Sequence, residues 1–332
     1  MYGRRRRRVL LGTVLALLFA YTAFAGARDL LNQKDRMLNN RSPVRWPGRG
    51  QAAFVLGNDS PASSPHEQPV PIASLAKVMT AYLTLTRYPL SGAQDGFTIS
   101  ITTAQAQAEA RDAAQNQSRV AVQAGEQLTE RQLLEALLIP SGNNIAWMLA
   151  DRVAGSETRF IAEMNDEAHA LGMDRTVYTD PSGFDPNTVS TAADQLRVFQ
   201  QTMRFPAFRQ IVSMASVTLP VAGTLTNYNP LVAEGYAGKT GSDSAAGGCL
   251  AFFTHVTVAG HGLTAVGVVL GQGHGSDTSV ILASAAEAAT QLVESVAPAT
   301  PVSTIAAPAV ADEYRVGYAP GYTIQPRPRR VG

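Results

Sequence analysis

The last third of the chain holds two apolar segments joined by a tight turn, and they constrain the fold more than any other feature. Residues 249–258 and 263–270 are strand candidates, and Ala259-Gly260-His261-Gly262 between them is typical of a hairpin. Residues 51–56 and 236–241 are further strand candidates, while helix-forming segments fill the centre and the end of the folded part. This order predicts an α+β fold, in which an antiparallel sheet is flanked by helices and accompanied by a helical region.

Ser74 and Lys77 stand at the start of an apolar segment, residues 74–87, that is expected to be a helix. On an α-helix, residues three apart share a face, with Cβ atoms about 5–6 Å apart. A serine hydroxyl needs a neighbouring base to become a nucleophile, and burial lowers the pKa of a lysine amine until it can be that base. The backbone N–H groups of a helix start also favour developing negative charge. The pair predicts nucleophilic catalysis, although the same spacing also occurs on ordinary solvated helices.

Lysine usage supports the catalytic interpretation. The chain has 27 lysine and arginine residues, of which only Lys34, Lys77 and Lys239 are lysine. Arginine does not deprotonate in a protein, so only lysine can serve as a base. Lys239 belongs to a second short motif, Lys239-Thr240-Gly241, on a predicted edge strand. Such a strand could line a cleft and present Lys239 to a carboxylate, or simply end in a turn.

A third motif, Ser141-Gly142-Asn143, lies between two predicted helices, residues 129–138 and 144–153. A turn with a helix cap is the simplest interpretation. In an active site, the Ser141 hydroxyl could relay a proton between substrate and Lys77, and the Asn143 amide could hold a substrate backbone group.

Export or anchoring is indicated by the N-terminus, where Arg4–Arg8 precede an uncharged apolar segment, residues 9–25. We interpret residues 1–27 as a signal peptide or an N-terminal membrane anchor, which places the rest outside the cytoplasm. Residues 28–50 are predicted to be a juxtamembrane linker, and the proline-rich residues 297–332 a disordered tail. The net charge of +1 gives no sign of the basic surface that binds nucleic acids. The single cysteine, Cys249, excludes a disulfide framework and is predicted to be a small buried side chain.

The three motifs occur in a fixed order, separated by 67 residues from Ser74 to Ser141 and 98 from Ser141 to Lys239. With their flanking residues, they resemble the D-alanyl-D-alanine carboxypeptidase family of low-molecular-mass penicillin-binding proteins, which share a serine β-lactamase-like fold. Further similarity lies in Gly247-Gly248-Cys249-Leu250 and Asp180-Pro181-Ser182-Gly183. The resemblance covers about residues 50–292, so residues 51–296 are expected to form a penicillin-binding serine peptidase domain.

The resemblance implies removal of the terminal D-alanine from peptidoglycan stem peptides through an acyl-enzyme, with β-lactams as covalent inhibitors and no metal or cofactor. The implied roles are nucleophile for Ser74, base for Lys77, proton shuttle for Ser141, substrate orientation for Asn143, carboxylate binding for Lys239, Thr240 and Gly241, and a backbone oxyanion hole at Ser74 and Ser242.

Asn144 departs from the family pattern, which often has aspartate there. The C-terminal segment is too short for the second β domain and amphipathic membrane helix of some relatives, so any membrane tether is expected to be N-terminal. A D,D-endopeptidase, a serine β-lactamase and an inactive cell-wall-binding relative remain as alternatives. For a β-lactamase, none of the glutamates between the second and third motifs lies in the expected loop pattern, so a β-lactam acyl-enzyme is expected to be long-lived.

Overall fold

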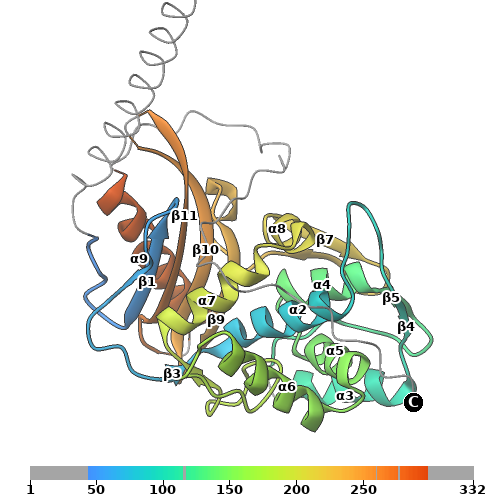
Figure 1. The fold of residues 1–332 in the computed structure, drawn as a ribbon. Coiled ribbons are helices and arrows are strands. Elements are labelled where there is room, and N and C mark those ends of the chain that lie inside the picture. Colours follow the sequence, from blue (N-terminus) through green and yellow to red (C-terminus); the bar gives the residue numbers. More distant parts are fainter. Residues whose placement is uncertain (1–43, 115–116, 259, 276, 298–332) are drawn as a thin grey trace, which may run out of the picture. The chain divides into compact units, whose positions relative to one another are not determined.

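The computed structural model describes residues 44–114, 117–258, 260–275 and 277–297, and these form a fold based on a five-stranded sheet (Figure 1). Its strands are β1 (Gln51–Leu56), β2 (Ala62–Ser63), β9 (Ala237–Asp243), β10 (Gly247–Val258) and β11 (His261–Gln272). The order across the sheet is β2-β1-β11-β10-β9, and every neighbouring pair is antiparallel. The early strand therefore joins the late ones, and the predicted α+β class is confirmed.

The β10–β11 hairpin is confirmed, with Leu250 opposite Val269 and Val258 opposite His261. Seven consecutive residues of β10, from Gly248 to Thr254, are buried. Because successive side chains point to opposite faces of a sheet, such a run requires cover on both faces. Two helices provide it: α7 (Ala192–Thr202) contacts β1 and β11, and α9 (Thr278–Val296) contacts β9, β10 and β11 (Figure 1).

The helical region surrounds one central helix, α2 (Ala76–Arg87), which contacts α4, α5, α6 and α7. Its residues from Ala76 to Leu85 are all buried, as expected of a helix enclosed by others. A polar side chain between Ala76 and Leu85 is therefore removed from water. The other helices of the region are α3 (Thr103–Ala114), α4 (Glu130–Leu138), α5 (Asn143–Ala154), α6 (Glu157–Ala170) and α8 (Pro206–Val212).

Helix starts follow their sequence signals. The sequence Thr129-Glu130-Arg131-Gln132 predicts a capping box at the start of α4. The box is present, since Thr129 Oγ1 accepts a hydrogen bond from the backbone N–H of Gln132 and the Gln132 side chain accepts one from Thr129 N. Ser156 caps α6 without a reciprocal bond, because its Oγ accepts a hydrogen bond from the backbone N–H of Arg159. Three two-stranded sheets complete the fold: β3 (Val70–Pro71) with β6 (Val189–Ser190), β4 (Thr98–Ser100) with β5 (Gln127–Thr129), and β7 (Ser216–Leu219) with β8 (Gly223–Thr226).

The sequence also predicts a short extended segment at residues 227–232, and this prediction is wrong. Asn227 Oδ1 accepts a hydrogen bond from Asn229 N at 2.9 Å, and Asn229 Oδ1 accepts one from Leu231 N at 3.1 Å. Asparagine side chains that bond the backbone two residues on create turns, and these turns lead into the short 3-10 helix η2 (Val232–Glu234).

The predicted leader, residues 1–27, lies outside the described residues, as do residues 28–43 of the linker and residues 298–332 of the tail. The last residues of the linker contact the folded part: Arg45 N donates to Ser295 Oγ at 3.2 Å, and Gln272 Nε2 donates to Arg49 O at 2.9 Å. Among the helices of the described part, none has the length and apolar character needed to cross a membrane.

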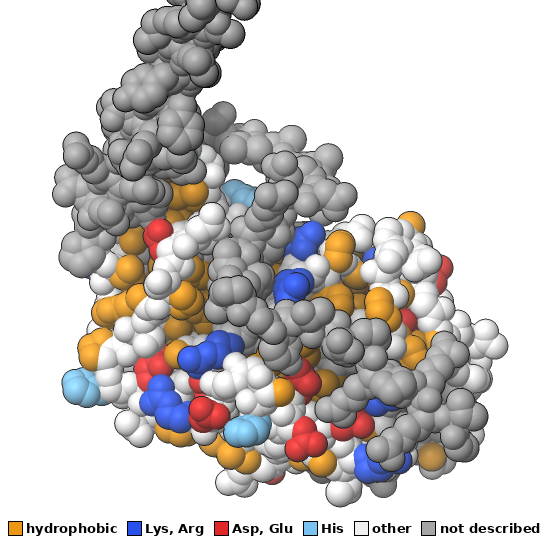
Figure 2. Space-filling view, in the orientation of Figure 1, with side chains coloured by type: hydrophobic (Ala, Val, Ile, Leu, Met, Phe, Trp, Pro, Cys, Tyr) orange, Lys and Arg blue, Asp and Glu red, His pale blue; other side chains and the backbone are white. Residues whose placement is uncertain are grey.

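On the face shown in Figure 2, the basic and acidic side chains of the described residues are interspersed over the helical region. Neither sign forms a continuous patch on that face. The distinctive charges of this protein are instead two fully buried lysines, which belong to the candidate site.

Candidate active site

Ser74 and Lys77 meet where a 3-10 turn passes into the central helix. Ser74 lies in η1 (Ala73–Leu75), and Lys77 is the second residue of α2. The α-helical start expected at Ser74 is thus corrected to a 3-10 turn, in which residues three apart lie almost directly above one another. Lys77 Nζ donates a hydrogen bond to Ser74 Oγ at 2.8 Å. Ser74 is half-buried whereas Lys77 is fully buried, so the hydroxyl is the accessible end of the pair.

The Lys77 amine has three hydrogen-bond acceptors. Besides Ser74 Oγ, it donates to Asn143 Oδ1 at 2.7 Å and to Ser182 O at 2.8 Å. Burial lowers the pKa of Lys77 from 10.5 to about 7, and the carboxylate charge of Asp180 partly opposes this shift. At neutral pH a large share of the Lys77 amines is therefore unprotonated and able to accept a proton.

The loop Asp180-Pro181-Ser182-Gly183 covers Lys77, a role that sequence reasoning did not assign to it. Each Asp180 carboxylate oxygen accepts two hydrogen bonds, at 2.6–2.9 Å. Oδ1 accepts from Gly183 N and Thr188 Oγ1, and Oδ2 accepts from Ser182 Oγ and Phe184 N. Asp180 therefore fixes the loop around its own carboxylate. The fixed loop directs Ser182 O at Lys77 and, through Pro181 O, accepts a hydrogen bond from Thr80 of α2 at 2.7 Å.

Gly183 lies against Ala73, the residue before Ser74. A Cβ built on Gly183 would be 1.8 Å from Ala73 O, so only glycine permits this approach. Ala73 itself has φ +45°, and Ser141 has φ +63°. Together with His66 they are the non-glycine residues of the described part that adopt positive φ. Such strained backbone tends to occur at functional sites, and two of these three residues belong to this one.

Ser141 and Asn143 occupy the turn between α4 and α5, and both are buried. Asn143 is the first residue of α5 and accepts its bond from Lys77, as described above. Ser141 Oγ accepts a hydrogen bond from Lys239 Nζ at 2.9 Å. The structure thus connects Asn143 to the first lysine and Ser141 to the second, whereas the sequence suggested Ser141 as the neighbour of Lys77.

Lys239 comes from β9, the edge strand of the sheet, and is fully buried. Its amine also donates to Thr240 O at 2.9 Å. Burial, and secondarily the charge of Lys77, hold the pKa of Lys239 well below its usual range. Thr240, the next residue of the strand, is buried as well. A bound carboxylate would offset both effects on Lys239, so this end of the site is suited to an anionic group.

Gly241 brings the strand β9 against the 3-10 turn that holds Ser74. A Cβ on Gly241 would lie 2.8 Å from Ile72 O and 3.1 Å from Ser74 N, so the absence of a side chain leaves the Ser74 N–H approachable. Ser242 follows on the same strand and is half-buried. The predicted oxyanion donors, the backbone N–H groups of Ser74 and Ser242, therefore belong to segments that are in contact through Gly241.

Comparison with known proteins gives a match over most of this region. A profile of the D-alanyl-D-alanine carboxypeptidase family, peptidase family S11, matches residues 62–273, which include all three motifs. This chain belongs to that family. The expectation drawn from the motifs is thereby confirmed at the level of the family.

Curated relatives of the family fall into two kinds. A D-alanyl-D-alanine endopeptidase of Pseudomonas aeruginosa is 36% identical over 142 residues, which are 42% of this chain and 42% of that protein. The D-alanyl-D-alanine carboxypeptidase DacB2 of Mycobacterium tuberculosis is 34% identical over 185 residues, which are 53% of this chain and 59% of that protein. This chain thus spans about half the length of the curated relatives it matches.

Among solved structures, the Streptomyces K15 DD-transpeptidase is similar over 76% of this chain and 98% of its own, with a TM-score of 0.63 and 25% identity. The sheet with flanking helices is therefore the family's fold.

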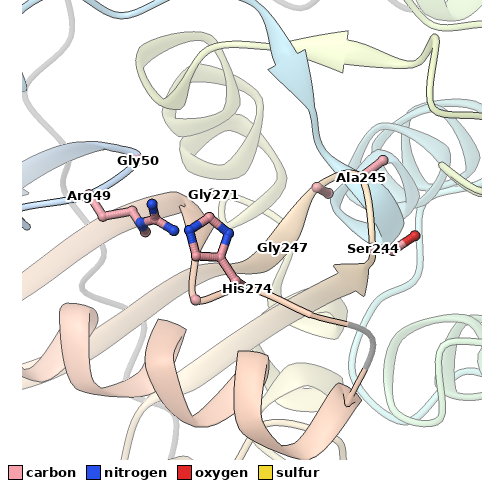
Figure 3. A pocket seen from close by; sticks show the side chains of 9 residues that line it. Arg49, Gly50, Ser244, Ala245, Gly247, Gly271 and His274 are labelled. Carbon is pink, nitrogen blue, oxygen red and sulfur yellow. The ribbon is translucent and has the colours of Figure 1, made fainter.

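A cavity of about 300 Å³ lies at the end of the sheet, beside the turn between β9 and β10 (Figure 3). The side chains of Arg49 and His274 are directed toward each other there. The lining consists of Arg49, Gly50, Ser244, Ala245, Ala246, Gly247, Gly271, Gly273 and His274. No motif residue lines this cavity, so it is separate from the Ser74–Lys77 pair. Within the described ranges, no group of three or more His, Cys, Asp or Glu residues is arranged to hold a metal ion.

One further residue of the site was missed from the sequence. Asn143 Nδ2 donates to the Gln117 side-chain oxygen at 2.8 Å. Gln117 lies 26 positions before Asn143, in a polar segment with no motif, and no signal in the sequence singled it out.

Proposed function

We propose that this chain is a serine D,D-peptidase, and foremost a carboxypeptidase that removes the terminal D-alanine from peptidoglycan stem peptides. The observation that carries the proposal is the fully buried Lys77 amine, 2.8 Å from Ser74 Oγ, with its pKa lowered to about 7. A nucleophile and a base of matched pKa within hydrogen-bond distance are what acyl transfer requires.

In the acylation step, neutral Lys77 takes the proton of Ser74 as the Ser74 oxygen attacks the carbonyl carbon of the penultimate D-alanine. The negative charge that develops on the carbonyl oxygen would be stabilised by the N–H groups of Ser74 and Ser242. Losing one such donor costs about 3–4 kcal/mol of transition-state stabilisation in a comparable site. The C–N bond then breaks, D-alanine leaves with a proton passed from Lys77, and an ester on Ser74 remains.

Proton delivery to the leaving amine and binding of its carboxylate fall to the second half of the site. Lys239 and Thr240 would bind the terminal carboxylate, which favours the protonated form of Lys239. Ser141, which accepts from Lys239 at 2.9 Å, lies beside this group and would pass the proton toward the departing nitrogen. Asn143 would hold a substrate backbone group.

Hydrolysis of the ester needs a water activated by a base, and Lys77 is again suited to this role. Asp180, whose charge acts on Lys77, has both oxygens occupied by hydrogen bonds from its own loop and is poorly placed to activate water. In a β-lactam the group that would leave stays attached after ring opening and keeps its place beside Ser74, which hinders the approach of water, so the acyl-enzyme would be long-lived. This favours a penicillin-inhibited peptidase over a β-lactamase.

The substrate places the domain outside the cytoplasm, facing the cell wall. We propose that residues 1–27 direct export and either are removed or remain as a membrane anchor, because the arginine run and apolar segment have that composition. Residues 51–296 would then be the catalytic domain, with the linker before it and the proline-rich tail after it.

A D,D-endopeptidase that cuts cross-links is the second candidate, favoured by the 36% identity to an enzyme of that name in Pseudomonas aeruginosa. Both reactions would use the same nucleophile, since each breaks a bond after a D-alanine carbonyl. They differ in the leaving group.

The test is to incubate the full-length chain and its Ser74→Ala variant with a fluorescent penicillin. Stable labelling of the wild type and none of the variant is expected. Release of free D-alanine from a muramyl pentapeptide would then support the carboxypeptidase, whereas cleavage of cross-linked dimers without that release would favour the endopeptidase. A folded wild-type chain that is never labelled, or that sheds the label within seconds, contradicts the proposal.

A further inference from the structure

Two adjacent asparagines hold the segment 117–120 against the start of α5. Asn143 N donates to Ser118 O at 2.8 Å. Asn144 Oδ1 accepts from Val120 N at 3.0 Å, while Asn144 Nδ2 donates to Val120 O at 2.8 Å. The Asn144 side-chain amide therefore bonds both the N–H and the C=O of Val120, as a neighbouring strand would. An ionised aspartate offers only acceptors and could not bond Val120 O.

The segment held in this way delivers Gln117 to the active site. Gln117 Oε1 accepts from Asn143 Nδ2 at 2.8 Å, while Asn143 Oδ1 accepts from Lys77 Nζ at 2.7 Å. The Asn143 amide is thus held from both ends. If it rotated by half a turn, its N–H groups would face the Lys77 amine, and an acceptor of Lys77 would be lost.

We propose that Gln117 is a positioning residue of the active site, which fixes the Asn143 amide with its oxygen toward Lys77. The inference rests on the proposed function, since it concerns how the same site prepares its base. Gln117 acts through Asn143, and Asn144 secures the segment that carries it.

Burial makes this arrangement consequential. Asn143 is 4% exposed and Lys77 is 0% exposed, so water has little access to replace a lost partner of either. A buried donor left without its acceptor is costly, and the amide would then adopt other orientations. Each other orientation of the amide removes Asn143 Oδ1 as an acceptor of Lys77. Only Ser74 Oγ and Ser182 O would then hold the Lys77 amine in line with Ser74.

The experiment compares the full-length wild type with Gln117→Ala and Gln117→Glu, using the rate constant of acylation by a fluorescent penicillin from acid to alkaline pH. Gln123→Ala is the matched control, because Gln123 is an exposed glutamine a few residues further on. Thermal unfolding of each variant is measured alongside. The Ser74→Ala variant is included as the test of the nucleophile itself.

Gln117→Ala is expected to lower the acylation rate constant about tenfold, the size of one hydrogen bond in a buried network, in protein that thermal unfolding shows to be folded at the assay temperature. Gln117→Glu keeps the acceptor and adds a negative charge near Lys77, which favours the protonated amine. The acidic limb of its pH profile should therefore move to higher pH, while its rate at alkaline pH returns toward that of the wild type.

Asn144→Asp provides an independent approach to the same contact, because it loosens the segment without touching Gln117. It should lower the rate as Gln117→Ala does. The inference is overturned if Gln117→Ala matches Gln123→Ala in rate and pH profile, or if its rate falls only in proportion to its stability. If Gln117→Ala fails in this way but the wild type is labelled and Ser74→Ala is not, the proposed function still holds. An unlabelled wild type would contradict both the proposed function and the role of Gln117.

Discussion

Replacing Gly183 with alanine tests the contact between the loop over Lys77 and the turn that carries Ser74, the proposed nucleophile. The new Cβ would lie 1.8 Å from Ala73 O and 2.5 Å from Ala73 C. Both are backbone atoms, so no flexible side chain can move aside. Carbon and oxygen that are not bonded stay roughly 3 Å or more apart, and the two segments must therefore separate by about 1 Å or more.

The separation acts on both partners of the proposed catalytic pair, Ser74 and Lys77. Ala73 directly precedes Ser74, and Ser182, next to Gly183, supplies a carbonyl acceptor to Lys77. A shift of about 1 Å in reacting groups can cost about 100-fold in rate. Gly183→Ala is accordingly expected to reduce the acylation rate constant with a fluorescent penicillin by about that factor. The left-handed backbone at Gly183, φ +77°, adds a stability cost of about 1 kcal/mol.

Gly172→Ala separates the two effects. Gly172 has nearly the same backbone conformation, φ +70°, but a Cβ there would meet nothing within 4 Å. It should lose similar backbone stability and keep its acylation rate. The reasoning is refuted if Gly183→Ala remains folded and is acylated as fast as Gly172→Ala.

Two further outcomes follow from the same geometry. The acylation rate of the wild type should rise through pH 7 to a plateau, because only the neutral Lys77 amine can take the serine proton and the pKa of Lys77 is lowered to about 7. A rate that instead keeps rising toward pH 10.5 would show that the pKa of Lys77 is not shifted. Gly241→Ala places a Cβ 2.8 Å from Ile72 O and 3.1 Å from Ser74 N. It should lower kcat for D-alanine release by about tenfold or more with a smaller change in KM, and steady-state kinetics showing only a raised KM would argue against an oxyanion role for this contact.

Sequence patterns predicted the parts of this fold that depend on local chemistry. The β10–β11 hairpin follows from two apolar segments and a glycine-rich turn, and the start of α4 from the Thr129–Gln132 capping box. The turns at Asn227 and Asn229 were missed because the segment also contains residues that suit a strand, and the side-chain bonds to backbone prevailed.

The site was predictable only where its chemistry requires particular side chains. Lysine is a required base and therefore leaves a signal, especially in a chain with three lysines. The acceptor that Ser182 supplies is a backbone carbonyl, 105 positions from Lys77, which any residue type could provide. Gln117 is one polar residue among several in its segment, and only folding shows that it reaches Asn143.

The burial that lowers the pKa of Lys77 also lowers the stability of the protein at neutral and acidic pH. The pKa of Lys77 falls from 10.5 in the exposed chain to about 7 in the folded protein, so between these values the unfolded state binds more protons. Stability contributed by this group therefore rises with pH across that window and is lowest below pH 7. The difference is on the order of 5 kcal/mol, at about 1.4 kcal/mol per pKa unit. A hydrophobic residue in place of Lys77 would avoid this cost, as the neighbouring buried residues Val78 and Met79 of α2 do. A lysine in this position is consistent with selection for a base rather than for stability.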